Sequence, residues 1–229
     1  MLLSKQMFDE NLALFIKADN GSTYFPNPKS TVQGNFVELF TFVGKIIGKA
    51  LWEQQLLDCY FIKAFYKMIL DMPLDYNDLE DYDQSLYKSL KWILENNNVE
   101  QLSSYFVETM DYFGTQKEEE LVPDGRNKLV TDDNKQEYVR LVANFRLDRA
   151  ISEQKNAFLA GFYSIVPKDL LKIFDNRELE LLISGLQNID IDDLRENTAY
   201  NGYNARSRPV LLLWEVLQEL ENTERAEFI

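Results

Sequence analysis

The chain has 229 residues, of which 45% are hydrophobic, so it is long enough to bury a sizeable core as one large domain. Its net charge of −14 excludes the basic surface that nucleic acid binding needs, and it favours a basic protein partner. Histidine is absent and Cys59 is the single cysteine, which excludes histidine-dependent catalysis, a four-thiolate zinc site and an intrachain disulfide. No apolar run has signal-peptide character or approaches the roughly 18 residues of a membrane span.

The first part of the chain is predicted to be helical around one hairpin. Residues 1–11 have an amphipathic pattern that favours a helix. Two short apolar runs, 12–17 and 23–25, flank Asn20-Gly21, and this arrangement is typical of two strands joined by a tight turn.

Two further helices are predicted before residue 73. Apolar residues recur at helical spacing over 35–52, where Gly44 and Gly48 would allow another element to approach closely. A second helical segment is expected over 56–70, and Pro73 ends it.

Composition then changes over residues 71–83, which are acidic. A short helix is expected next, followed by three strands, and these elements form a small mixed α/β part within a mainly helical chain. The expected ranges are 85–94 for the helix and 105–113, 118–122 and 128–131 for the strands.

The remainder is predicted to be helical. Thr131–Asn134 supply capping residues for one long helix over about 135–163. Four shorter helices follow, at 170–174, 177–184, 190–197 and 209–220.

The sequence offers few candidate residues for a catalytic site contained within this chain, and no metal or cofactor is expected. Gly44–Lys49 lacks the spacing of a phosphate-binding loop and lies inside a helix, which favours packing glycines. The acidic clusters 78–83 and 190–193 lack EF-hand spacing, so solvated faces or helix-terminal acids are expected. Cys59 lies in an apolar stretch, as a buried structural thiol would.

Four stretches, taken in order, resemble the N-terminal lobe of the HECT-type E3 ubiquitin-protein ligases. Phe42–Leu51 is similar to F-x-G-[KR]-x-x-x-x-A-[LIV], and Leu56–Met68 to L-L-[DE]…F-Y-K. Pro123–Val139 is similar to P-[DN]-G-x-N-x-x-V-T-x-x-N-[KR]-x-E-[FY]-V, and Glu178–Gly185 to E-L-E-L-L-I-[SCG]-G. Together these motifs cover almost the whole chain.

The resemblance implies a fold and a boundary. The expected class is mainly α with a small α+β part: a helical N-lobe with small β-hairpins and an inserted subdomain. The large helical subdomain would comprise about 1–73 and 130–229, and the small E2-binding subdomain about 74–129. The family continues with a hinge and a C-lobe that holds the ubiquitin-accepting cysteine. This chain would stop before that lobe, at Ile229, and be inactive alone, because Cys59 does not match the catalytic cysteine.

The resemblance also implies a mechanism and partners. In the family an E2 enzyme docks on the N-lobe, ubiquitin passes to the C-lobe cysteine, and a substrate lysine receives it. The resemblance implies that substrates are selected through regions outside this domain, in the cytoplasm or the nucleus. Neither nucleic acid nor a membrane is an expected partner.

The E2 groove of the family takes up an aromatic residue of the E2, and a buried anchor of this kind concentrates binding energy. The matching positions form the expected E2-binding set; Asn96 replaces an aromatic residue that some members have. They are Leu86, Leu90, Asn96, Leu102 and Tyr138.

Some members also bind a second ubiquitin at an exosite on the N-lobe. The corresponding positions are Leu12, Phe113, Gln116 and Arg146, of which Leu12 and Gln116 depart from the residues of exosite-proficient members.

Two other functions remain open at this point. A non-catalytic helical scaffold would keep the fold but cover the groove with its own chain. A carboxylate metalloenzyme would require acidic residues that converge in one cleft.

Overall fold

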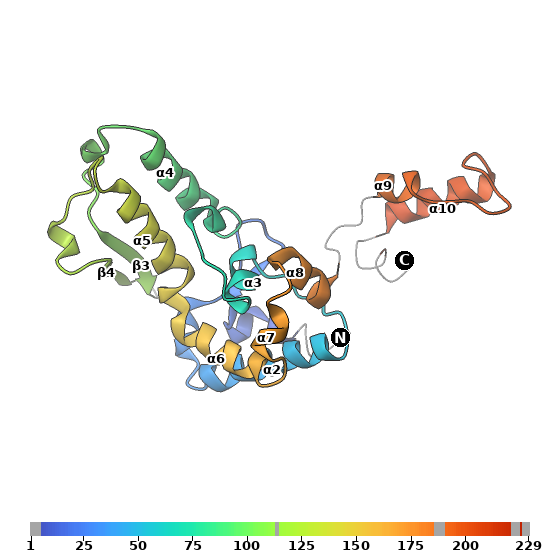
Figure 1. The fold of residues 1–229 in the computed structure, drawn as a ribbon, viewed down its shortest axis with the longest axis horizontal. Coiled ribbons are helices and arrows are strands. Elements are labelled where there is room, and N and C mark those ends of the chain that lie inside the picture. The colour runs from blue at the N-terminus through green and yellow to red at the C-terminus, as the bar shows by residue number, and fades with distance from the viewer. Residues whose placement is uncertain (1–5, 113–114, 186–190, 221–224, 226–229) are drawn as a thin grey trace. The chain divides into compact units, whose positions relative to one another are not determined.

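The computed structural model is mainly helical and has two small antiparallel sheets of two strands each, which confirms the predicted fold class (Figure 1). It describes residues 6–112, 115–185, 191–220 and 225. The chain divides into two compact units, Met1–Ile183 and Ser184–Ile229, and each is described by itself.

The first unit begins with the predicted hairpin. Strands β1 (Phe15–Lys17) and β2 (Tyr24–Pro26) pair antiparallel around the Asn20-Gly21 turn, so that prediction is confirmed. Of the helix predicted over 1–11, residues 6–7 are helical and residues 10–12 belong to the 3₁₀ helix η1 (Glu10–Leu12), while residues 1–5 lie outside the described residues. A further 3₁₀ helix, η2 (Pro28–Val32), follows the hairpin.

Helices α2 (Phe36–Trp52) and α6 (Ser152–Tyr163) pack against each other with backbone almost touching backbone (Figure 1). A Cβ atom on Gly44 would lie 2.1 Å from the carbonyl oxygen of Phe158, and one on Gly161 would lie 2.0 Å from that of Thr41. Glycine is therefore required on both helices, and the reading of Gly44 as a packing residue is confirmed.

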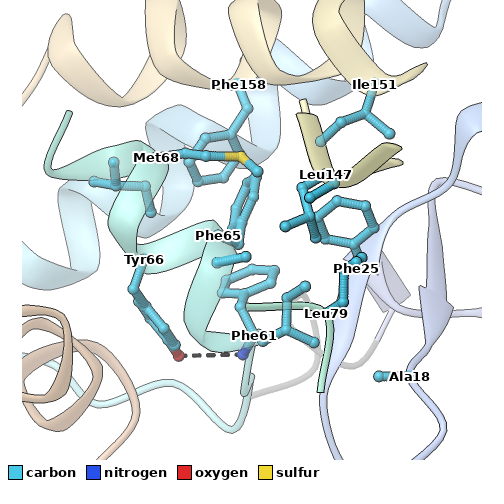
Figure 2. Packing of buried hydrophobic residues seen from close by; sticks show 14 of the residues in the cluster. Ala18, Phe25, Phe61, Phe65, Tyr66, Met68, Leu79, Leu147, Ile151 and Phe158 are labelled. Atoms are coloured by element: carbon cyan, nitrogen blue, oxygen red, sulfur yellow. Dashed lines mark hydrogen bonds between the residues drawn. The ribbon is translucent and has the colours of Figure 1, made fainter. Parts of the chain in front are cut away.

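The core of the first unit is rich in aromatic rings, and helix α3 (Lys63–Ile69) contributes two of them, Phe65 and Tyr66. Figure 2 shows Phe61, Phe65 and Phe158 in one cluster, in which the first two rings are tilted and the last two meet edge-on, with 4.8 Å between the ring centroids of each neighbouring pair. The Tyr66 hydroxyl accepts a hydrogen bond from the Phe61 amide at 3.2 Å. This bond fixes the extended segment before α3, so the predicted helix over 56–70 is wrong for residues 56–62.

The middle of the chain contains the expected mixed structure. After the 3₁₀ helix η3 (Tyr76–Leu79) come helix α4 (Gln84–Glu95) and the 3₁₀ helix η4 (Val99–Leu102). Strands β3 (Val107–Tyr112) and β4 (Thr115–Glu120) form a hairpin, and the 3₁₀ helix η5 (Gly125–Asn127) follows it. The third predicted strand, 128–131, is wrong except for one isolated bridge between Leu129 and Tyr105.

The predicted long helix over 135–163 is also wrong as a single element. The structure has α5 (Lys135–Leu147), the 3₁₀ helix η6 (Arg149–Ile151) and then α6, and the two α-helices run in different directions (Figure 1). The break occurs at Asp148, whose φ of −121° and ψ of −59° leave the helical region. Leu147 and Ile151 are both fully buried, so core packing on either side holds the bend.

The remaining predicted helices are present. Helix α7 (Lys168–Leu171) begins and ends earlier than predicted, and α8 (Asn176–Ser184) lies within a residue of its prediction. In the second unit, α9 (Ile191–Glu196) and α10 (Arg208–Glu219) pack around a small core of Ile191, Val210, Trp214 and Leu217. Among the described residues, no helix is both long and apolar enough to cross a membrane.

Candidate functional site

Helix α4 places Leu86 and Leu90 on one face, as their spacing of four predicts, but at different depths. Asp83 caps the helix by accepting the Leu86 amide at 2.8 Å. Leu86 is partly exposed, whereas Leu90 is only 2% exposed and belongs to the core. Leu86 is therefore the member of this pair that a partner could reach.

The end of α4 and the start of α5 are tied together through Asn96. Its side-chain amide donates to the carbonyl of Trp92 at 2.9 Å, and its own carbonyl accepts from the Lys135 ammonium group. Asn96 thus fixes the end of the helix, and this geometry accounts for a polar residue at that position.

Leu102 stands exposed at the end of η4, with 47% of its surface accessible. The backbone on both sides of this short helix is left-handed, with φ of 59° at Asn98 and 50° at Ser103. Asp132 holds the first of these turns by accepting the amides of Asn98 (2.8 Å) and Val99 (3.3 Å). The Asn98 amide is the main reason that the pKa of Asp132 is lowered. Leu102 is therefore presented by a braced turn.

A recess of about 360 Å³ lies beside Tyr138, between the β3–β4 hairpin and α5. Tyr105 and Val107 contribute apolar walls, and Arg126 and Glu118 stand at its charged side. Tyr138 is 8% exposed and meets the buried ring of Phe106 edge-on, with 5.4 Å between centroids. Burial, and secondly the carboxylate of Glu108, raise the pKa of Tyr138 to about 12.

Sequence reasoning missed Tyr105, which is 43% exposed at this recess. The alternation of side chains over residues 105–109, the segment that leads into β3, could have found it. Tyr105, Val107 and Thr109 line the recess, whereas Phe106 and Glu108 are buried on the opposite face.

Glu108 is a buried carboxylate that pairs with Arg146 of α5 at 2.7 Å. Burial raises the pKa of Glu108, and the guanidinium of Arg146 opposes that rise. The pair ties the hairpin to α5 below the recess. Arg146, one of the predicted exosite residues, therefore has a structural partner inside the fold.

The other predicted exosite residues are distributed over separate elements. Leu12 ends η1 with 36% of its surface exposed, and Gln116 is exposed on β4. Phe113 lies outside the described residues.

The acidic and thiol candidates have structural roles. Asp78 is 2% exposed, accepts the Asp75 amide at 2.9 Å and lies 2.7 Å from the Lys67 ammonium group, so it is a buried helix-capping acid and not part of a solvated face. Cys59 is 1% exposed, as predicted. Within the described part of the chain, no three His, Cys, Asp or Glu side chains are grouped so as to hold a metal ion.

The family model of the HECT-domain (ubiquitin-transferase) matches residues 1–229. The chain therefore belongs to the HECT-domain family, the class of E3 ubiquitin transferases.

Curated relatives match it over its full length. It is 43% identical to an E3 ubiquitin-protein ligase TOM1-like of Neurospora crassa, over 229 residues that make up 6% of that protein. It is 44% identical over 235 residues to the E3 ubiquitin-protein ligase UPL1 of Arabidopsis thaliana, of which it covers 6%. It is 42% identical over 231 residues to the mouse E3 ubiquitin-protein ligase HUWE1, of which it covers 5%. The chain thus spans a small fraction of the length of these relatives.

Proposed function

We propose that this chain is the N-terminal lobe of its HECT domain and that it docks a ubiquitin-loaded E2 enzyme. The observation that carries the proposal is the recess beside Tyr138, which exposed Tyr105 lines. Exposed Leu102 lies three residues before Tyr105 in the chain. An aromatic or aliphatic anchor of the partner would enter this recess and lose its hydration there.

The rigidity of the surroundings supports this role. Phe106, Tyr138 and the Glu108–Arg146 pair form a packed floor, and Lys128 lies over the Phe106 ring at 4.0 Å. A preorganised surface lowers the entropy cost of binding, so a modest apolar area can give useful affinity. The family motif Pro123–Val139 runs through η5 and the start of α5, and thus through the elements that build this floor.

The chemistry of ubiquitin transfer then belongs to the whole protein. Because Cys59 is buried in the core, we propose that the cysteine that accepts ubiquitin lies in a C-lobe outside residues 1–229. Substrate proteins would be selected by other regions of the full-length ligase, inside the cell. Ubiquitin binding at Leu12, Phe113, Gln116 and Arg146 remains a further proposal from the resemblance alone.

One observation favours a second candidate, a non-catalytic scaffold with the same fold. Leu90 and Tyr138, two of the predicted groove residues, are largely covered by the protein's own chain. In that case the recess would bind no E2.

The two candidates are separated by measuring the binding of a panel of purified E2 enzymes by isothermal titration calorimetry. If docking occurs, Leu102→Asp weakens the binding of the cognate E2 by about tenfold or more, which corresponds to about 1.4 kcal/mol. Leu170→Asp is the matched control, because Leu170 is a leucine of similar exposure (54%) on α7. If no E2 of the panel binds the folded chain, or if both variants weaken binding equally, the docking proposal is wrong.

A further inference from the structure

The chain contains two Asn-Gly pairs, Asn20-Gly21 and Asn201-Gly202, and the structure holds them in opposite ways. Asn-Gly is the sequence in which the backbone nitrogen of the second residue most readily attacks the side-chain amide of the first, because glycine has no Cβ to hinder the approach. Whether this attack occurs depends on how firmly the folded chain holds the two groups.

Asn201 lies in the loop between α9 and α10, in a segment that is anchored on either side of it. On one side, the Tyr200 hydroxyl accepts from the Trp214 indole at 3.0 Å. On the other, Ser207 and Asn204 bond each other, at 3.0 Å from amide to carbonyl and 3.1 Å from amide to hydroxyl.

Between these anchors the Asn201-Gly202 pair faces solvent. Asn201 and Gly202 are both exposed, and among the described residues neither makes a hydrogen bond. Gly202 has a φ of +75°, and a Cβ added to it would meet nothing within 4 Å. The nucleophilic nitrogen and the amide carbon are thus free to approach each other.

At Asn20 both reacting groups are held. The side-chain oxygen of Asn20 accepts from the Ser22 amide, the Thr23 amide and the Thr23 hydroxyl, each at 3.0 Å. The Gly21 amide donates to the carbonyl of Ala18 at 2.9 Å. This Asx turn would have to open before the Gly21 nitrogen could attack.

We propose that Asn201 is a site of spontaneous deamidation in the folded protein and that Asn20 is protected. The Gly202 nitrogen forms a bond to Cγ of Asn201, the bond from Cγ to Nδ2 breaks, and ammonia leaves with the proton of the Gly202 amide. The resulting cyclic imide is opened by one water molecule at either carbonyl. The product at position 201 is aspartate or isoaspartate.

The change would alter the loop in two ways. Both products place a new carboxylate in the exposed loop before α10. Isoaspartate also adds a methylene to the backbone between the Tyr200 anchor and the Asn204 turn, so the fixed spacing between these anchors no longer fits. The isoaspartyl product belongs to the substrate class of isoaspartyl carboxyl methyltransferases.

The test is to age the whole chain in mildly alkaline buffer and to follow both pairs by peptide mass spectrometry. Isoaspartate is located by fragmentation that separates the two isomers and by enzymatic methyl transfer to the peptide. In the native protein, residue 201 is expected to convert about tenfold faster than residue 20, because hydrogen bonds must open at residue 20. In denaturant, where neither fold persists, the two rates are expected to converge.

Two variants sharpen the result. Asn201→Gln removes the five-membered imide route, so conversion at 201 should stop while the rate at residue 20 stays unchanged. Thr23→Val removes one of the bonds to the Asn20 side chain, so conversion at residue 20 should accelerate. Conversion of Asn20 in the native chain at the rate of Asn201 or faster would overturn the proposal. So would a native Asn201 that stays intact over a period in which the denatured chain converts.

Discussion

The crossing of α2 and α6 predicts a large penalty for the smallest substitution, Gly161→Ala. Its Cβ would lie 2.0 Å from the Thr41 carbonyl oxygen, whereas an ordinary carbon–oxygen contact is about 3.3 Å or longer. Both atoms are held by helix backbone, so the helices must separate by about 1.3 Å at the crossing.

Separation on this scale weakens the dispersion contacts along the helix pair, because a gap of about 1 Å already removes up to half of the attractive energy of each contact. Overpacking of this kind costs about 1–3 kcal/mol or more, and the better helix propensity of alanine returns about 1 kcal/mol. We expect a net loss of about 2 kcal/mol in the free energy of unfolding, and a fall in the melting temperature of about 4–8 °C for a chain of this size.

Urea and thermal unfolding followed by circular dichroism measure this change. Gly44→Ala should match Gly161→Ala, since its Cβ would lie 2.1 Å from the Phe158 carbonyl oxygen. Gly48→Ala should cost less, because its closest contact is 3.0 Å. Gly34→Ala is the control, since its Cβ would meet nothing within 4 Å and the substitution should be neutral or slightly stabilising. A Gly161→Ala protein as stable as the Gly34→Ala control would refute the close crossing.

Two further predictions concern a buried phenol and a strained backbone. Because burial and Glu108 raise the pKa of Tyr138 from 10 to about 12, the stability contributed by its neutral form is fully present below pH 10 and is lost as the pH rises through 12. Burial also raises the pKa of Tyr82 and of Tyr163 to about 12, so an alkaline titration by ultraviolet difference absorbance should lose the amplitude of one tyrosine near pH 12 in Tyr138→Phe. An unchanged curve in that variant would contradict the burial of Tyr138. Gln54 has a φ of +56° just after α2, a backbone conformation that glycine adopts without strain. Gln54→Gly should therefore raise the free energy of unfolding, measured in urea, by about 0.5–1 kcal/mol. A loss of stability would show that the side chain of Gln54 contributes more than the strain costs.

Local patterns in the sequence predict the elements whose signals are themselves local. The apolar periodicity of α2, α4 and α10 and the Asn-Gly turn of the first hairpin depend on neighbouring residues, and all four elements are present. The apolar pattern of α5 continues into α6, so it hides the bend at Asp148. That bend depends on α2, more than a hundred residues earlier, against which α6 must lie.

The third predicted strand fails for a similar reason. Residues 128–131 have strand-like side chains, but the Val130 amide donates to the Ser104 carbonyl at 2.8 Å in an irregular connection. Side-chain composition indicates a preference for extended backbone, and it does not say which partner the amide will find.

The candidate site shows the same limit at the level of single residues. Spacing correctly places Leu86 and Leu90 on one face of α4, but the depth of each depends on what other elements cover. Similarly, arginine is a residue type typical of surfaces, which favours a binding role for Arg146. The structure instead pairs Arg146 with Glu108, which lies 38 residues away in the sequence. Because Leu90 is buried whereas Leu102 and Tyr105 are exposed, the expected docking surface moves from the face of α4 to Leu102 and Tyr105.

This shift changes how the docking proposal should be probed. Leu90 and Tyr138 support the surface from within, so their substitution would disturb folding and binding together. Leu102 and Tyr105 can be changed with little loss of packing, because 47% and 43% of their surfaces already face solvent. A loss of E2 binding in these two variants, with unfolding curves that match the unmodified chain, would therefore report on the interface itself. The same loss in a Leu90 variant could not be separated from damage to the core.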